Sequence, residues 1–274
     1  MKKGIKLCAL SGALLLSGCY LKVDVVGQGT VTDTLSGVTC VDSCIKRSVG
    51  SFKQAILTAE AAPGYQFVGF VEDYKDPYTD YVRVNEKSLN IIYGYGYLYV
   101  GDTEPLALVQ ARSKVTAVFL PEGSVQQSQH TTGSLCVLGQ DQSLQCWGKM
   151  QPVVAKLTDT VTGIVAEPGN FVTSNQWCLL TDSALKCWNE TTLQSWPIPS
   201  SITSPTSAAL SNDIVCVIDQ GNGVPTLSCL HEDGSPLLGT PDITNPEQVS
   251  VNESGQFCAE ANGGTQCWNA IDTL

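Results

Sequence analysis

The sequence of 274 residues is poor in histidine, in basic residues and in long apolar runs. Its two histidines, His130 and His231, lie outside any Gly-x-Ser-x-Gly motif, so neither is placed to serve a serine nucleophile. The 15 basic residues stand against 26 acidic ones and form no long cluster of the kind that binds a phosphate backbone, so we expect no nucleic-acid partner. The first apolar run, Leu7 to Leu16, is too short to span a bilayer.

A recognisable catalytic or metal-binding constellation is also missing. Paired carboxylates arise by chance in so acidic a chain, and cysteines held in disulfides offer no thiolate. The histidines stand apart, and the cysteine spacings differ from those of zinc sites. We therefore expect no catalytic residue, no cofactor and no metal. One alternative is a calcium site at the dense oxygen ligands Glu72, Asp73, Asp76 and Asp80, whose spacing differs from that of an EF-hand loop.

An export signal and a lipidation site stand at the N-terminus. Three lysines precede the apolar run, and Leu16-Ser17-Gly18-Cys19 closes it, a pattern that resembles the signal peptide and lipobox of bacterial lipoproteins. The resemblance implies removal of residues 1–18 and a lipidated terminus at 19–21, where diacylglycerol and an acyl chain such as palmitate on Cys19 anchor the protein to a membrane. Tyr20 stands where inner-membrane lipoproteins often carry aspartate, so we expect the outer membrane. The alternative is a cytosolic protein with an apolar first helix.

Ten of the twelve cysteines remain once Cys8 of the signal and Cys19 are set aside. An even number of cysteines in an exported chain favours disulfides, because the compartment is oxidising. Spacing alone does not fix the connectivity, but it favours bridges between neighbours. The favoured pairs are Cys40 with Cys44, Cys136 with Cys146, Cys178 with Cys187, Cys216 with Cys229, and Cys258 with Cys267. Loss of the three signal lysines changes the formal charge from −11 to −14, which suits a soluble envelope protein.

Residues 22–121 contain strand-like runs separated by glycine and Asp/Asn turns. They resemble the small β repeat of bacterial surface proteins, which implies a β-sandwich or β-grasp-like domain. Two departures are Phe70, where that repeat usually has tryptophan, and a long insert from Glu72 to Thr103. The motifs that carry the resemblance are Gly27-Gln28-Gly29-Thr30-Val31, the Cys40 and Cys44 pair, Pro63-Gly64-Tyr65, and Val115-Thr116-Ala117-Val118-Phe119.

Residues 122–274 repeat themselves. The first cysteines of four pairs, at 136, 178, 216 and 258, recur at intervals near forty residues, which is typical of propeller blades or helical arrays. Two short strand-like runs around a polar turn surround each pair, so each unit is predicted to be a β-hairpin stapled by its disulfide. Trp147, Trp188 and Trp268 follow the second cysteine, with Leu230 in the third unit. Alternation along a strand places them on the face opposite the cysteine, where we expect them to pack between blades.

The elements Cys-x-Leu and Cys-Trp-Gly/Asn, with a proline-containing lead-in from Pro241 to Pro246, resemble the disulfide-bearing bacterial form of the regulator of chromosome condensation repeat. That family usually closes a propeller with seven blades, whereas four units are found here. The predicted fold is therefore all-β, with a small β-sandwich or β-grasp-like N-terminal domain and a propeller-like array of four disulfide-stapled hairpin units. Such an array is open, closed in an unusual way or completed by a partner.

Tyrosines crowd the insert of the first domain, and tyrosine beside glycine marks many recognition surfaces. The candidate ligand-binding residues are Tyr74, Tyr78, Tyr81, Tyr95 and Tyr97. The alternative is an ordinary hairpin whose aromatics pack on a neighbouring sheet. We expect a non-catalytic outer-membrane lipoprotein that binds a protein or glycan in the envelope or outside the cell. The other functional hypotheses are an envelope assembly scaffold on a membrane protein complex and, more weakly, a polysaccharide-acting enzyme.

Overall fold

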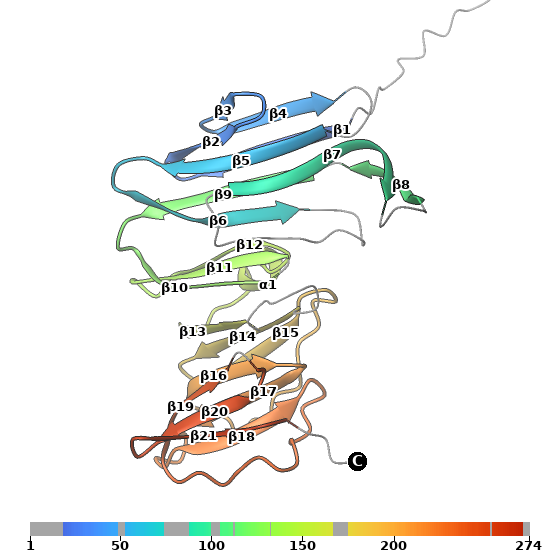
Figure 1. The fold of residues 1–274 in the computed structure, drawn as a ribbon. Helices are drawn as coiled ribbons and strands as arrows, with labels where there is room; N and C mark the ends of the chain where they lie inside the picture. Colours follow the sequence, from blue (N-terminus) through green and yellow to red (C-terminus); the bar gives the residue numbers. More distant parts are fainter. Residues whose placement is uncertain are drawn as a thin grey trace, which may run out of the picture.

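The computed structural model describes residues 19–48, 53–73, 88–99, 105–111, 113–131, 133–166, 175–252 and 254–270. Over these residues the chain is all-β apart from one short helix, α1 (Gln151–Val154). No helix in these ranges is both long and apolar enough to cross a bilayer. The described strands form six sheets: β1 to β9 make two of them, and the other four follow in sequence order (Figure 1).

Strands β1 to β9 form two sheets that face each other as a sandwich. One sheet has the order β4-β1-β9-β6 and the other β3-β2-β5-β7-β8. Strands β1 and β9 run parallel, and the other pairs are antiparallel. The bounds are β1 Cys19–Val26, β2 Gly29–Asp33, β3 Val38–Cys40, β4 Ser43–Ser48, β5 Lys53–Ala61, β6 Tyr65–Asp73, β7 Ser88–Tyr99, β8 Pro105–Ala111 and β9 Ser113–Pro121.

Alternation along β9 gives this strand two apolar faces. Val115 and Phe119 are fully buried between the two sheets, in the core of the sandwich. Val118 points to the opposite side, where it packs with Leu135 and Val137 of the next sheet. The four-stranded sheet is therefore covered on both faces near β9, and the sandwich continues directly into the array.

Four three-stranded antiparallel sheets follow, which we call blades 1 to 4. Each contains the predicted hairpin, with the paired cysteines directly opposite each other. The five disulfides join the ten cysteines in the neighbouring pairs that the spacing favours. The bounds are β10 Val125–His130, β11 Ser134–Gly139 and β12 Leu144–Gly148; β13 Val161–Ala166, β14 Gln176–Thr181 and β15 Leu185–Asn189; β16 Pro205–Ser211, β17 Ile214–Asp219 and β18 Thr226–His231; β19 Pro246–Val251, β20 Phe257–Ala261 and β21 Gly264–Trp268.

The third strand of each blade was not expected from the sequence. A first strand, β10, β13, β16 or β19, pairs with each hairpin and carries a bulge near its start. Strand β10 lies in a stretch rich in Ser, Gln and Thr, from Gly123 to Ser134, whose composition is that of a linker. It forms a strand here with a partner for the polar side chain of Gln127. Gln127 donates from Nε2 to the Ile164 carbonyl (2.6 Å) and accepts the Ile164 N–H at Oε1 (2.9 Å), which links blade 1 to blade 2.

The blades stack face to face below the sandwich (Figure 1). Neighbouring blades contact each other through their first strands, in the pairs β10 with β13, β13 with β16, and β16 with β19. Farther from these strands, connecting segments fill the space between blades: Met150 lies between blades 1 and 2, Trp196 between blades 2 and 3, and Leu237 between blades 3 and 4. The result is a propeller-like fan of four blades.

Candidate functional site

Each of the first three blades turns its disulfide towards the next blade. Cysteines that oppose each other across a strand pair share one face, and the residue after the second cysteine stands on the other. The Cys136–Cys146 bridge packs with Trp188 of blade 2. Leu230 packs against the bridge of blade 2, and Trp268 against that of blade 3. The expected packing role is therefore confirmed for these three residues.

Trp147 has a different neighbour. It packs with the cluster that joins blade 1 to the sandwich, beside Val71 and Val118. The reason is its position in the first unit, because the preceding layer is the four-stranded sheet and not a blade. Trp147 thus joins the two parts of the chain, and the expectation that it packs between blades was wrong.

A buried polar cluster links blades 1 and 2. Thr131, after β10, donates its hydroxyl to Glu190 Oε1 at 2.7 Å. The indole N–H of Trp177 is directed to both acceptors, at 3.1 Å from Thr131 Oγ1 and 3.3 Å from Glu190 Oε1. Glu190 is fully buried, and its Oε2 has no hydrogen-bond partner among the described residues. Because a buried carboxylate depends on the donors it is given, this cluster fixes the register of the two blades.

The outward face of blade 4 is polar. Its positions equivalent to apolar residues of the inner blades hold Glu260 and Thr265, both exposed. A face that carries these groups in place of leucine resembles the capping repeat of a stacked array. The apolar residues at these positions in blades 1 to 3 are Leu138, Leu180 and Ile218 on the second strand, and Leu144, Leu185 and Leu227 on the third.

A groove of about 490 Å³ opens on the array between the β17–β18 turn and the lead-in to blade 4. Apolar and polar residues line it in equal number: the apolar ones include Val224, Pro225, Pro241 and Ile243, and the polar ones are three threonines, an asparagine and the single carboxylate Asp242. Val224 is 60% exposed at its wall. We call this site the array groove.

Hydrogen bonds hold both walls of the array groove. The Asp219 carboxylate accepts the backbone N–H groups of Thr203 (3.0 Å), Ser204 (2.6 Å) and Gly221 (3.1 Å), which fixes the base of the β17–β18 turn. On the other wall, the Asn262 side-chain amide donates to the Thr244 carbonyl at 3.3 Å. The groove is therefore preformed, and a ligand does not have to order these segments.

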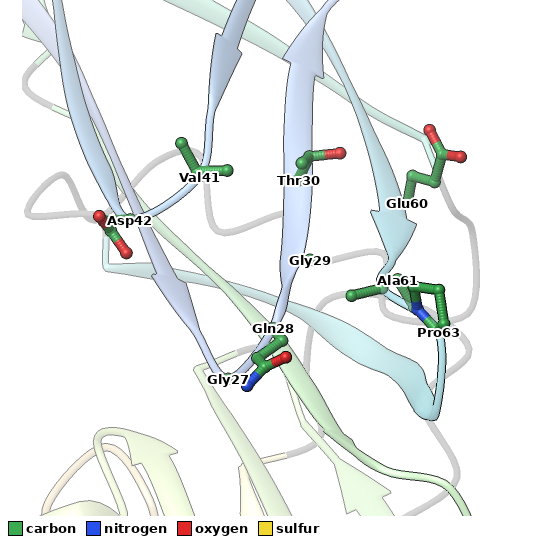
Figure 2. Close-up of a pocket in the computed structure, with 10 residues that line it drawn as sticks. Gly27, Gln28, Gly29, Thr30, Val41, Asp42, Glu60, Ala61 and Pro63 are labelled. Carbon is green, nitrogen blue, oxygen red and sulfur yellow. The ribbon is translucent and has the colours of Figure 1, made fainter.

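A second groove, of about 510 Å³, lies where three turns of the sandwich meet (Figure 2). Gly27 closes it from below: its φ is +82°, and a Cβ there would lie 1.9 Å from the Phe119 carbonyl oxygen, so only glycine fits. Figure 2 shows the carboxylates of Asp42 and Glu60 on opposite sides, with Thr30 between them. We call it the sandwich groove. It offers carboxylate and hydroxyl oxygens to a polar ligand.

The predicted tyrosine site is only partly within the described residues. Tyr95 and Tyr97 lie on β7, where they pair with Gln110 and Leu108 of β8. Tyr74, Tyr78 and Tyr81 lie outside the described residues. Neither groove contains a tyrosine of the predicted set.

The other candidate residues are separated along the chain. Cys19 begins β1 and pairs with Ser48 at the end of β4. His130 lies on β10, not in a linker, and burial lowers its pKa. Of the calcium alternative, Glu72 and Asp73 end β6, whereas Asp76 and Asp80 lie outside the described residues. In the described ranges no three His, Cys, Asp or Glu side chains gather as a metal site.

Sequence reasoning missed the buried cluster and both grooves. Thr131 and Glu190 are 59 positions apart, and only the packing of two blades brings them together. The sequence does single out Glu190 in one respect. It follows Cys187-Trp188-Asn189, and the equivalent position of blade 1 holds a residue of opposite charge, Lys149. The grooves are made by turns, whose approach in space leaves no periodic pattern in the sequence.

Comparisons with known proteins identify no family. No family model and no curated protein matches the sequence. Among solved structures, the chain is similar to the computationally designed Ika4 protein (13% identity, TM-score 0.38, 54% of this chain and 92% of that chain). It is also similar to a chain of the nidogen/laminin complex (11%, 0.35, 50% and 57%) and to human WBSCR16 (10%, 0.41, 91% and 76%). At these TM-scores the likenesses carry no argument about fold or function.

Proposed function

We propose that the protein is a non-catalytic lipoprotein of the outer membrane that binds a macromolecular partner through its propeller-like array. The observation that carries this proposal is the array groove, a preformed hollow with Val224 exposed at its wall. The lining holds no aromatic ring on which a sugar could stack, whereas two prolines and aliphatic side chains with polar groups between them suit an extended protein segment. We therefore favour a protein partner over a glycan.

The blades give this groove a rigid support. The Cys216–Cys229 bridge ties the two strands that flank the β17–β18 turn, and its other side packs against Phe257 and Trp268 of blade 4. Binding loops on a rigid scaffold lose little entropy when a partner docks. The disulfide-stapled stack thus acts as the frame for the groove.

Anchoring at the outer membrane rests on the lipobox and on Tyr20 after Cys19. The five disulfides support export, since such bridges persist in oxidising compartments. Cys19 lies at the start of β1, so a lipid on this residue would hold the sandwich close to the bilayer.

The test is site-specific crosslinking in cells. A photoreactive amino acid at Val224 is expected to give one discrete protein adduct, and the same label at Asp182, on an exposed turn of blade 2, is expected to give none. Ile243→Asp places a charge in the groove and should remove the Val224 adduct. Equal adducts from both positions would contradict the proposal. If instead the protein binds an envelope polysaccharide and Ile243→Asp abolishes that binding, the groove is a glycan-binding site.

A further inference from the structure

Exposed large apolar side chains gather along one edge of the sandwich. Seven such side chains are exposed among the described residues, and four of them lie within residues 35–45. We call these four the apolar edge: Leu35 (56% exposed), Val38 (45%), Val41 (64%) and Ile45 (55%). Single exposed apolar residues are ordinary, but a cluster of this kind on one edge marks an interaction surface.

The backbone under the apolar edge is held in place. The Cys40–Cys44 bridge closes the β3–β4 connection, and the Val25 N–H donates to the Asp42 carbonyl at 2.6 Å. The Asp33 carboxylate accepts the Leu35 N–H at 3.2 Å and so fixes the β2–β3 turn. The apolar side chains are therefore displayed by a fixed backbone.

The apolar edge lies on the side of the sandwich remote from the array. Strand β3 is the edge of the five-stranded sheet, and β4 is the edge of the four-stranded sheet. The array packs next to β6, the opposite edge of the four-stranded sheet. In Figure 1, β3 and β4 lie at the top and the blades at the bottom.

The same edge adjoins the proposed lipid site. Cys19 pairs with Ser48 at the end of β4, and Ile45 is three residues away along that strand, or about 10 Å at 3.3 Å per residue. The sequence places two adjacent cations, Lys46 and Arg47, between them. With Asp42, residues 35–48 carry a formal charge of +1, against −14 for the chain without residues 1–18. Anionic headgroups attract such a segment and repel the rest of the chain.

We propose that the apolar edge lies on the bilayer that holds Cys19, and that this contact directs the array away from the membrane. The proposal rests on the proposed lipid anchor. The protein contact supplements the acyl chains, because interfacial apolar side chains and nearby cations together bind a lipid surface. The array groove is then presented to partners beyond the membrane surface.

The first test uses residues 19–274 with Cys19→Ser, exported behind a signal peptide that is removed without lipidation, and vesicles of phosphatidylethanolamine and phosphatidylglycerol. We expect this chain to sediment with the vesicles, less so at high salt. Replacing Leu35, Val38 and Ile45 by serine should lower partitioning at least about tenfold, since three apolar contacts are lost together. The matched control replaces Leu193, Val224 and Leu238, the exposed apolar residues of the array, by serine and should leave partitioning unchanged.

Two results with vesicles would overturn the proposal: no binding of the Cys19→Ser chain, or equal partitioning of the two triple variants. A dimer of the chain that only the edge variant converts to monomer would also overturn it, since the apolar edge would then contact a second copy. The chain used carries no lipid, so failure here leaves the lipid anchor itself intact.

A second measurement does not depend on removing the edge. All five tryptophans of the chain lie in the array, so brominated lipids are expected to leave their fluorescence unquenched. A tryptophan introduced by Leu35→Trp should be quenched in the same vesicles, whereas one introduced by Val224→Trp should not. Quenching of the native tryptophans, or none at position 35, would place another surface on the bilayer.

Discussion

Removal of the Thr131 hydroxyl should weaken the contact between blades 1 and 2 and lower the free energy of unfolding. Thr131→Val keeps the size and branching of the side chain but deletes the donor to Glu190 Oε1 (2.7 Å) and the acceptor of the Trp177 indole N–H (3.1 Å). Trp177 then retains only the longer contact with Glu190, at 3.3 Å. Glu190 is fully buried and keeps a single donor.

The expected cost follows from these two bonds. A hydrogen bond to a charged group contributes about 1.5–3 kcal/mol and a neutral one about 0.5–1.5 kcal/mol, so Thr131→Val should lower the free energy of unfolding by about 2–4 kcal/mol. With an m-value of about 2 kcal/mol per molar urea, the unfolding midpoint falls by about 1–2 M. Thr131→Ser keeps the hydroxyl and should retain most of the stability.

The assay is urea unfolding with disulfides intact, followed by tryptophan fluorescence. The matched control is Thr192→Val, the same chemical change on an exposed turn, where the hydroxyl accepts one backbone N–H at 3.3 Å. We expect that control to stay within about 0.5 kcal/mol of the wild type. If Thr131→Val shifts the midpoint no more than Thr192→Val, the buried cluster does not hold the blades together and the reasoning fails.

Three further predictions concern the sandwich, the pH dependence and the end of the array. Gly27→Ala should lower the melting temperature several times more than Gly37→Ala. Both glycines have positive φ, but only a Cβ on Gly27 would lie within 4 Å of backbone atoms. Equal falls in melting temperature would contradict this prediction. Burial depresses the pKa of His130 below 6.5, so the unfolded chain takes up the proton first and the free energy of unfolding falls as the pH drops through 6.5. His130→Gln should flatten this dependence on pH. An unchanged dependence would exclude His130 as its source. Glu260→Leu with Thr265→Leu should make the outer face of blade 4 adhesive, seen as concentration-dependent association in sedimentation velocity, and a strictly monomeric double variant would refute its capping role.

Local patterns made the hairpins and the disulfides predictable. Each pair of cysteines lies close in sequence, and strand alternation then fixes which face the neighbouring tryptophan occupies. This reasoning succeeded for Trp188 and Trp268. It was wrong for Trp147, because the sequence does not show that the sandwich sheet precedes blade 1 in the stack.

Features that depend on distant segments could not be found in this way. Strand β10 is polar because Gln127 binds the backbone of blade 2, so its sequence resembles a linker. The parallel pairing of β1 with β9 and the cluster of Thr131 with Glu190 arise only when remote segments meet. The apolar edge, by contrast, was visible in the sequence as scattered apolar residues, but their exposure required the fold.

The measurement that tests the account most directly is mass spectrometry of the mature N-terminus from isolated outer membranes. We predict a chain that begins at Cys19 and carries the mass of a diacylglyceryl group and an acyl chain, with Cys19→Ala left unprocessed and unlipidated. An N-terminus at Met1, or an unmodified Cys19 in the soluble fraction, would contradict the account, because the anchor and the orientation of the array both depend on that residue.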